Sequence, residues 1–371
     1  INWEASGDVS AFHSKPWKDI PGISNLPLSF WMGPDQGTLA LNAKDVTLEF
    51  ADLFRDPLIL KQVIGDLTWK ADTDSITLNT DQLFAANDDI HTVTRMRMDI
   101  PRSEQEPLFL DLQSDYWDGD AITTHRYLPA GIMGENVVAW LDRSIGEGHV
   151  TEGSVVVRGP LQDFPFNTTH SGRFEVFFNV ENLKLDYWPE WPALNNLNAD
   201  VRFLNNSFDT WATGGSILDS RLESAHATIA DLAFTSPLQL TGQVKGPFND
   251  NLRLLTESPL KADFAQLTKG LNGEGDAQLG LSFSLPIDDG SPFKLDGKLS
   301  FLNSTLALAD WKLALNKIQG DLQFDQDHIF ASGIKGEALG LPIIVDVATP
   351  KHNAKATRIS ARATISSKNL Q

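Results

Sequence analysis

The chain has 371 residues, 49 of them acidic and 30 basic, so its formal net charge at pH 7 is −19. A surface with this charge repels phosphate backbones, and the sequence has no basic patch interleaved with aromatic residues, which argues against a nucleic-acid partner. The chain contains no cysteine, which rules out disulfides, thiolate metal sites and cysteine nucleophiles.

Apolar residues alternate with polar ones in many short stretches, beginning with residues 46–50, 96–100 and 108–112. Residues such as Arg97 and Asp111 occupy the positions between them, so each stretch has one apolar and one polar face. This period of two predicts half-buried antiparallel strands. The turn residues that separate the stretches predict hairpins and meanders.

Two stretches have helical spacing instead. Apolar side chains recur at every fourth residue before Gly146, which predicts a helix near 131–145. Ser258 as N-cap and Pro259 at the first helical position predict a second helix near 259–271. We expect both helices to cover an edge or end of a sheet, and a plug or lid over an apolar groove is the alternative.

A two-part pattern recurs three times along the chain. Its first part is a glycine followed by apolar residues at alternate positions, and its second part is a ten-residue phrase that ends in an apolar-polar-apolar step. The three copies comprise residues 37–41 with 60–69, 172–176 with 194–203, and 297–301 with 315–324. Such periodicity is typical of an array of stacked units. We therefore predict three β modules in a continuous array truncated at both ends, at residues 1–126, 127–290 with both helices, and 291–371.

Signals for chemistry are missing from the sequence. The eight histidines have no metal-ligand spacing, and we find no nucleophile elbow, Walker A loop or dinucleotide-binding fingerprint. We therefore expect no catalytic residue, no metal site and no cofactor.

A group of motifs in the middle of the chain resembles the YhdP family of AsmA-like envelope proteins from Gram-negative bacteria. In order, the motifs are Tyr127-Leu128-Pro129, Trp140-Leu141-Asp142, the glycines from Gly146 to Gly159, Asp163-Phe164-Pro165-Phe166, Gly172-x-Phe174, and Tyr187 through Pro192 followed by Leu194 and Leu197. The resemblance implies a periplasmic protein of the repeating-β-groove lipid-transfer superfamily, anchored to the inner membrane when complete. It also implies that the protein moves phospholipid between the inner and outer membranes, which it would reach through parts missing from this fragment.

The resemblance and the alternation together predict a mainly β fold: an elongated, strongly curved antiparallel sheet of repeated strand units, shaped as a groove and accompanied by two short covering helices. One continuous face of this sheet would hold phospholipid acyl chains. The side chains that we expect to line it are Leu39, Leu41, Leu67, Trp69, Phe174, Val176, Val201, Phe203, Leu299, Phe301, Leu322 and Phe324.

An alternative reading produces the same alternation. In a closed β-sandwich two apolar faces cover each other, and such a protein would be a non-catalytic structural or assembly scaffold of the cell envelope. An enzyme is the least favoured reading. The chain starts at Ile1 and has no apolar run near the roughly 20 residues of a membrane-spanning helix, so we expect a soluble fragment of a longer protein.

Overall fold

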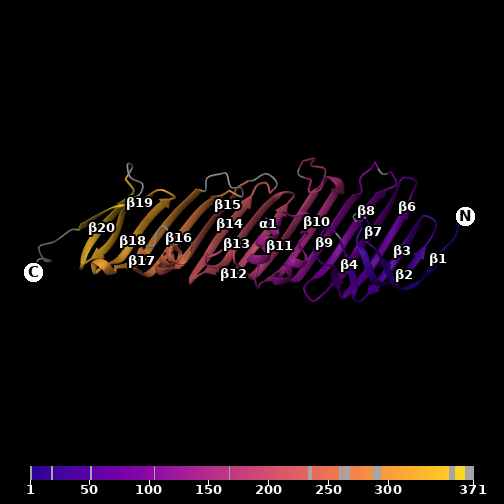
Figure 1. Ribbon diagram of the computed structural model, residues 1–371, viewed down its shortest axis with the longest axis horizontal. Helices are drawn as coiled ribbons and strands as arrows, with labels where there is room; N and C mark the ends of the chain where they lie inside the picture. Colours follow the sequence, from indigo (N-terminus) through magenta and orange to yellow (C-terminus); the bar gives the residue numbers. More distant parts are fainter. Residues whose placement is uncertain are drawn as a thin grey trace, which may run out of the picture. The chain divides into compact units, whose positions relative to one another are not determined.

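The structure is a computed structural model that describes residues 2–17, 20–50, 52–103, 105–166, 168–232, 236–258, 261, 268–286, 294–350 and 356–363. In these residues 21 strands form one antiparallel sheet that is not closed, accompanied by a few short helices (Figure 1). The prediction of a mainly β fold built on an antiparallel sheet is thereby confirmed. The alternative of a closed sandwich is wrong, because the strands belong to one open sheet.

Contacts within the chain divide it into two compact units. The first contains Ile1–Leu183 and Asp200–Phe208, and the second contains Lys184–Ala199 and Asp209–Gln371. The three-module division stays a prediction.

The strands of the first unit follow one another as hairpins for most of its length. They are β1 (Ala5–Ser14), β2 (Gly22–Met32), β3 (Gln36–Ala43), β4 (Val46–Glu49), β5 (Leu58–Leu60), β6 (Gln62–Ala71), β7 (Ser75–Ala86), β8 (His91–Pro101), β9 (Phe109–Asp120), β10 (His149–Pro160) and β11 (Arg173–Leu185). β2 pairs with both β3 and β4, and β3 pairs with β6, so the β4–β5 hairpin branches from the main ladder. The side chains of β3, β4 and β6 that meet at this branch form a buried cluster that includes Leu41, Ala43, Val46 and Val63.

The connection from β9 to β10 contains the longest helix of the first unit. It comprises the 3₁₀ helix η1 (Ala121–Arg126) and α1 (Glu135–Ser144), and a second 3₁₀ helix, η2 (Leu161–Asp163), follows β10. Glu135 in the first turn of α1 and Arg143 in its last turn both complement the helix dipole. The helix predicted near 131–145 is present as α1.

The second unit continues as consecutive antiparallel strands. Its elements are β12 (Leu194–Leu204, whose last residues belong to the first unit), β13 (Ser207–Ile217), β14 (Ser220–Ile229), β15 (Leu238–Pro247), α2 (Phe248–Thr256), β16 (Leu271–Leu285), β17 (Lys294–Leu308), η3 (Ala309–Trp311), β18 (Leu313–Asp325), β19 (Ile329–Ala338), β20 (Leu341–Ala348) and β21 (Arg358–Ala363). From β14 to β21 each strand pairs with the next.

The second predicted helix, near 259–271, lies mostly outside the described residues, and Leu271 already belongs to β16. The sequence analysis missed α2, which starts directly after Pro247 at the end of β15. Among the described helices none has both the length and the apolar character needed to cross a membrane.

Glycines of the repeated phrase have an unusual backbone conformation at equivalent places in two strands. Gly65 in β6 has φ of 150°, and Gly320 in β18 has φ of 133°, a backbone region that favours glycine. The ladder shifts its register just after Gly65, as expected of a bulge. A Cβ added to Gly65 would lie 2.6 Å from the carbonyl oxygen of Gln82. The glycine is therefore required by both backbone conformation and space.

We predict that Gly65→Ala lowers the stability of the chain by about 1–3 kcal/mol, because the added Cβ meets backbone and the φ is unfavourable for alanine. The measurement is the midpoint of urea unfolding. Gly280→Ala is the matched control, since a Cβ on this strand glycine would meet no atom nearer than 3.9 Å. Equal midpoints for the two variants would contradict the assignment.

Candidate functional site

The two parts of the repeated pattern pair with each other across neighbouring strands. In the first copy Gly37 faces Trp69, Leu39 faces Leu67 and Leu41 faces Gly65. In the third copy Gly297 faces Phe324, Leu299 faces Leu322 and Phe301 faces Gly320. The register is the same in both copies, so each copy of the repeat in the sequence corresponds to one antiparallel pair of neighbouring strands.

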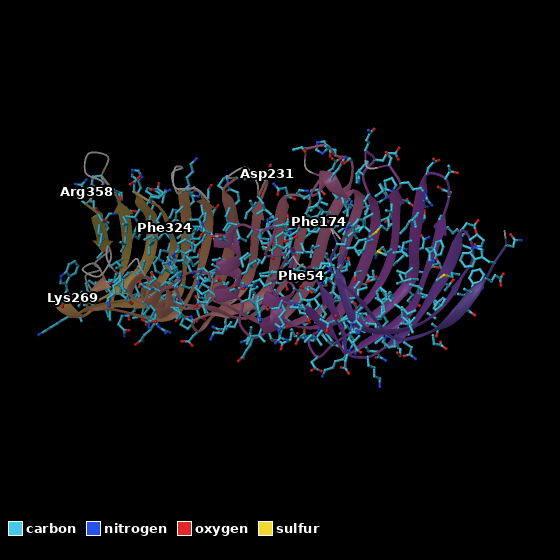
Figure 2. All side chains as sticks on the ribbon, turned by 45° about the vertical axis from the view of Figure 1, so that its right-hand side comes forward. Phe54, Phe174, Asp231, Lys269, Phe324 and Arg358 are labelled. Atoms are coloured by element: carbon cyan, nitrogen blue, oxygen red, sulfur yellow. The ribbon has the colours of Figure 1, made fainter. Side chains whose placement is uncertain are left out.

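In both copies the aromatic ring lies over the glycine opposite. A Cβ on Gly37 would lie 2.4 Å from Trp69 Nε1, and a Cβ on Gly297 would lie 2.1 Å from Phe324 Cζ. Such a ring shields the backbone of the glycine and packs along the sheet surface. These pairs therefore give the face a smooth apolar lining, of which Phe324 is visible in Figure 2.

The middle copy lies at β11 and β12. Val157 faces Phe174 and Val155 faces Val176, and the Phe174 ring also packs edge-on against Phe164 at 4.9 Å between ring centroids. β12 follows beside β11, because the backbone N–H of Asn205 donates to the carbonyl oxygen of Phe174 at 2.7 Å.

The other two predicted residues of the middle copy are on β12. They are Val201 and Phe203, and the Phe203 ring packs against Phe208 at 5.1 Å between centroids. The first and third copies thus each bring their four predicted residues together on facing strands.

The ladder connects the first copy to Phe174 through residues that the sequence analysis did not assign to the site. Trp69 faces Leu78, Leu78 faces Met98, and Met98 faces Leu110. Two residues further along β9, Leu112 faces Val157, which in turn faces Phe174. The alternation of apolar and polar residues at 96–100 and 108–112 could have identified these side chains as part of the apolar face. They were not assigned to it because both stretches lie outside the repeated pattern. We call this face, from β3 to β11, the apolar face of the first unit.

The second unit has an equivalent surface. Val244 faces Leu279, Leu279 faces Leu299, and Leu299 faces Leu322. This stripe crosses β15 to β18 and reaches a buried cluster around Ile318 and Ile334. We call it the apolar face of the second unit.

Neither face is covered to the extent of a protein core. Eleven of the twelve predicted side chains are half-buried, and Leu41 alone is buried, at 6% exposure. Among the described residues, Phe166 and Val46 are the large apolar side chains with less than 2% exposure. A second layer of side chains would bury the centre of each face more completely.

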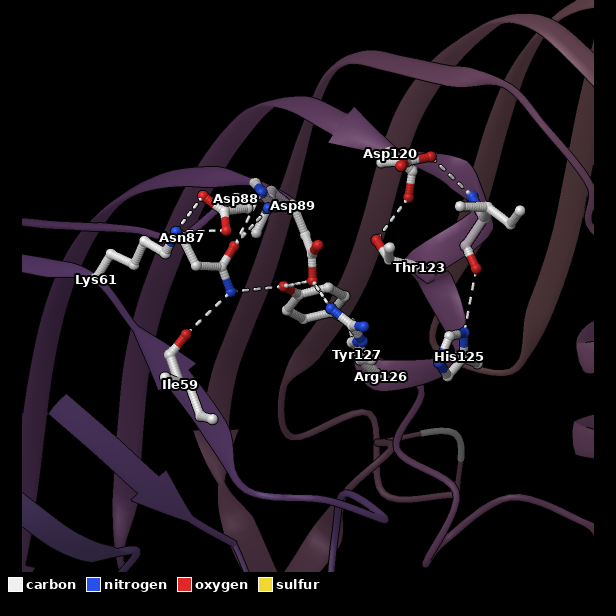
Figure 3. A network of polar contacts seen from close by, with 12 residues as sticks. Ile59, Lys61, Asn87, Asp88, Asp89, Asp120, Thr123, His125, Arg126 and Tyr127 are labelled. Atoms are coloured by element: carbon white, nitrogen blue, oxygen red, sulfur yellow. Dashed lines mark hydrogen bonds and ion pairs between the residues drawn. The ribbon is translucent and has the colours of Figure 1, made fainter. Parts of the chain in front are cut away.

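The η1–α1 connection is fixed to the first unit by polar contacts. Tyr127 donates from its hydroxyl to Asp89 at 3.0 Å and accepts from Asn87 Nδ2 at 2.8 Å, and Arg126 binds Asp89 at 2.7 Å (Figure 3). Burial raises the pKa of Tyr127 to about 12, so this hydroxyl stays a donor at neutral pH.

A second set of contacts fixes α1 itself. Arg55, in the β4–β5 loop, binds both carboxylate oxygens of Asp142 at 2.6 and 2.8 Å and donates to the carbonyl oxygen of His125. Nearby, the N–H of Gly131 donates to the carbonyl oxygen of Leu53 at 3.0 Å. The hydrogen bonds from Arg55 lower the pKa of Asp142. The bidentate pair therefore persists throughout the neutral range.

We predict that α1 loses protection from hydrogen exchange in acid. Because the folded-state pKa of Asp142 is below its unfolded value, its contribution is present at neutral pH and is lost as the pH falls below the usual aspartate range of about 4. Hydrogen exchange of residues 135–144, measured from pH 7 to pH 3, checks this. Asp142→Asn should exchange faster at pH 7 and show a weaker pH dependence, and an unchanged profile would contradict the role of the pair.

No group of three or more histidine, aspartate or glutamate side chains suited to a metal ion occurs in the part of the chain that the structure describes.

Comparison with known proteins gives one consistent result. A family model described as YhdP protein matches residues 1–371. The chain is 24% identical over 346 residues to the "Intermembrane phospholipid transporter YhdP" of Escherichia coli strain K12. This match covers 93% of the chain and 27% of that relative, so the chain spans about a quarter of the relative's length. No solved structure matches the chain.

Proposed function

Since the chain belongs to the YhdP family, we propose that its apolar faces bind phospholipid acyl chains and conduct them as one section of an intermembrane phospholipid transporter. The relative in Escherichia coli carries this activity in its name. The observation that supports the proposal most is the row of facing apolar side chains from Trp69 to Leu110 and from Leu112 to Phe174, all of them half-buried except Leu110, which is buried.

The dimensions of the first unit suit an acyl chain. Seven strands, β3 and β6 to β11, carry its apolar face, and six spacings of about 4.8 Å give a path of about 29 Å. Moving each CH₂ group from water to such a surface contributes about 0.8 kcal/mol. A two-chain lipid is therefore held by burial of its tails, without a specific contact to each carbon.

The mechanism that follows is passive sliding. The tails contact apolar side chains of similar character on every strand, so a step to the next strand replaces one apolar contact with another and meets a low barrier. The headgroup stays in water, because moving its polar and charged groups onto the apolar side chains would cost free energy without a compensating hydrogen bond. No covalent step and no cofactor take part.

The wider setting follows from the same family membership. We infer a periplasmic protein whose complete form is anchored in the inner membrane and moves phospholipid between the inner and outer membranes. In this proposal the section described by this chain supplies part of the lipid path.

We predict that Phe324→Asp removes phospholipid from the second unit, because a carboxylate beside Gly297 would have to be desolvated by each passing tail. Phospholipid retained per protein after purification, measured by native mass spectrometry, should fall several-fold. Gln323→Asp is the matched control, since it places the same charge one residue away on the exposed opposite face.

Retention of the same amount of phospholipid by both variants would count against the acyl-chain proposal. A wild-type chain that elutes free of lipid and instead captures envelope proteins would favour a scaffold.

A further inference from the structure

The face of the second unit opposite its apolar face contains a cleft of about 560 Å³. Its floor is a straight row of ladder partners in which Gln243 faces Gly280, Gly280 faces Lys298, Lys298 faces Gln323, and Gln323 faces Phe330. These positions alternate with Leu279, Leu299 and Leu322, so their side chains lie on the opposite side of the strands from the apolar face. Gly297 and Phe324, in the row between the polar positions, also border the cleft.

Aromatic side chains bound the cleft at both ends. At β13 and β14 the ring of Trp211 stacks on His226, with centroids 3.6 Å apart and planes 9° apart. His226 Nε2 lies 3.3 Å from an Asp209 carboxylate oxygen, which fixes the imidazole. At the other end is Phe330 on β19. Trp211 is 53% exposed and Phe330 is 55% exposed.

The middle of the cleft is low and polar. Gly280 has no side chain, and a Cβ there would meet no atom nearer than 3.9 Å. Around it lie hydroxyl and amide groups of Thr241, Ser282 and Gln323. Lys298 is paired with Asp321 at 2.8 Å, and the carboxylates of Asp296 and Asp325 also line the cleft. The cleft therefore presents hydrogen-bonding groups together with negative charge.

This combination selects a class of ligand. Acyl chains would leave the polar groups unsatisfied, and a polyanion would be repelled by a chain with a net charge of −19. An extended peptide usually adds to the edge of a sheet, whereas the cleft lies on a face. A sugar ring has C–H groups that pack on an aromatic ring and hydroxyls that bond to amides and hydroxyls.

We propose that this cleft binds a saccharide chain, with its sugar rings against Trp211 and Phe330 and its hydroxyls on the polar floor. The site is independent of the acyl-chain proposal, because its aromatic ends and polar side chains lie on the other face of the sheet. In a bacterial envelope the same chemistry is offered by cell-wall glycan and by the sugar head of a glycolipid.

Two binding assays test the proposal and separate these sources. One is co-sedimentation of the chain with purified insoluble cell-wall glycan, and the other is binding to phospholipid vesicles with and without lipopolysaccharide. Wild-type binding to the glycan alone indicates the wall, and binding that requires lipopolysaccharide in the vesicle indicates the glycolipid. Binding to neither saccharide probe would overturn the proposal.

Variants connect the binding to the cleft. Trp211→Ala and Phe330→Ala should each weaken binding about tenfold, and Gly280→Leu should do so by filling the floor while leaving the aromatic ends intact. Trp311→Ala is the matched control, because this tryptophan in η3 is 73% exposed and lies outside the cleft. An equal loss in the control, or none in the three cleft variants, would overturn the assignment.

Phospholipid retention provides the independent readout. It should be unchanged in Gly280→Leu, whereas Phe324→Asp should lose phospholipid. Failure of the saccharide proposal is thereby distinguished from failure of the acyl-chain proposal.

Discussion

The structure depends on one constraint of the antiparallel strand, in which successive side chains point to opposite faces while cross-strand partners share a face. Leu279, Leu299 and Leu322 therefore form one surface, and Gly280, Lys298 and Gln323 form another, although the two rows are adjacent in sequence. Because the sheet stays open, neither surface is consumed by packing against a second sheet. One set of strands can then present an apolar face and a polar face, which run side by side along the sheet.

Such an arrangement leaves the chain with little conventional core, and its stability has to come from elsewhere. The ladder hydrogen bonds supply much of it, and the buried clusters around Val46 and Ile318 concentrate apolar contacts at the β3–β4–β6 branch and across β18 to β20. Glycines contribute in two ways. Gly65 and Gly320 permit the register shifts beside them, while Gly37 and Gly297 allow a ring from a neighbouring strand to lie close to the backbone.

Much of this fold could be read from alternation and repetition, because both are local properties of the sequence. The strands at 46–50 and 108–112 and the helix near 131–145 are examples. The sequence also marked Leu39, Leu67, Leu299 and Leu322, but not that they face each other, since register depends on turns and bulges. Met98 and Leu110 were left out of the site because they lie outside the repeat.

Other features depend on contacts that sequence patterns do not reveal. Arg55 and Asp142 are 87 residues apart, and the Trp211–His226 stack needs the spatial relation of β13 and β14. The short helix α2 has too few turns to establish a period.

The shared register of the first and third copies has a further consequence. Each copy contains both strands of a facing pair. The register between these two strands is therefore kept when the whole copy is duplicated or deleted. Gain or loss of a whole copy preserves which side of the sheet is apolar, whereas a single inserted residue in a strand exchanges the two sides beyond it. A protein built this way can change in length by whole copies during evolution while the chemistry of its two surfaces stays the same.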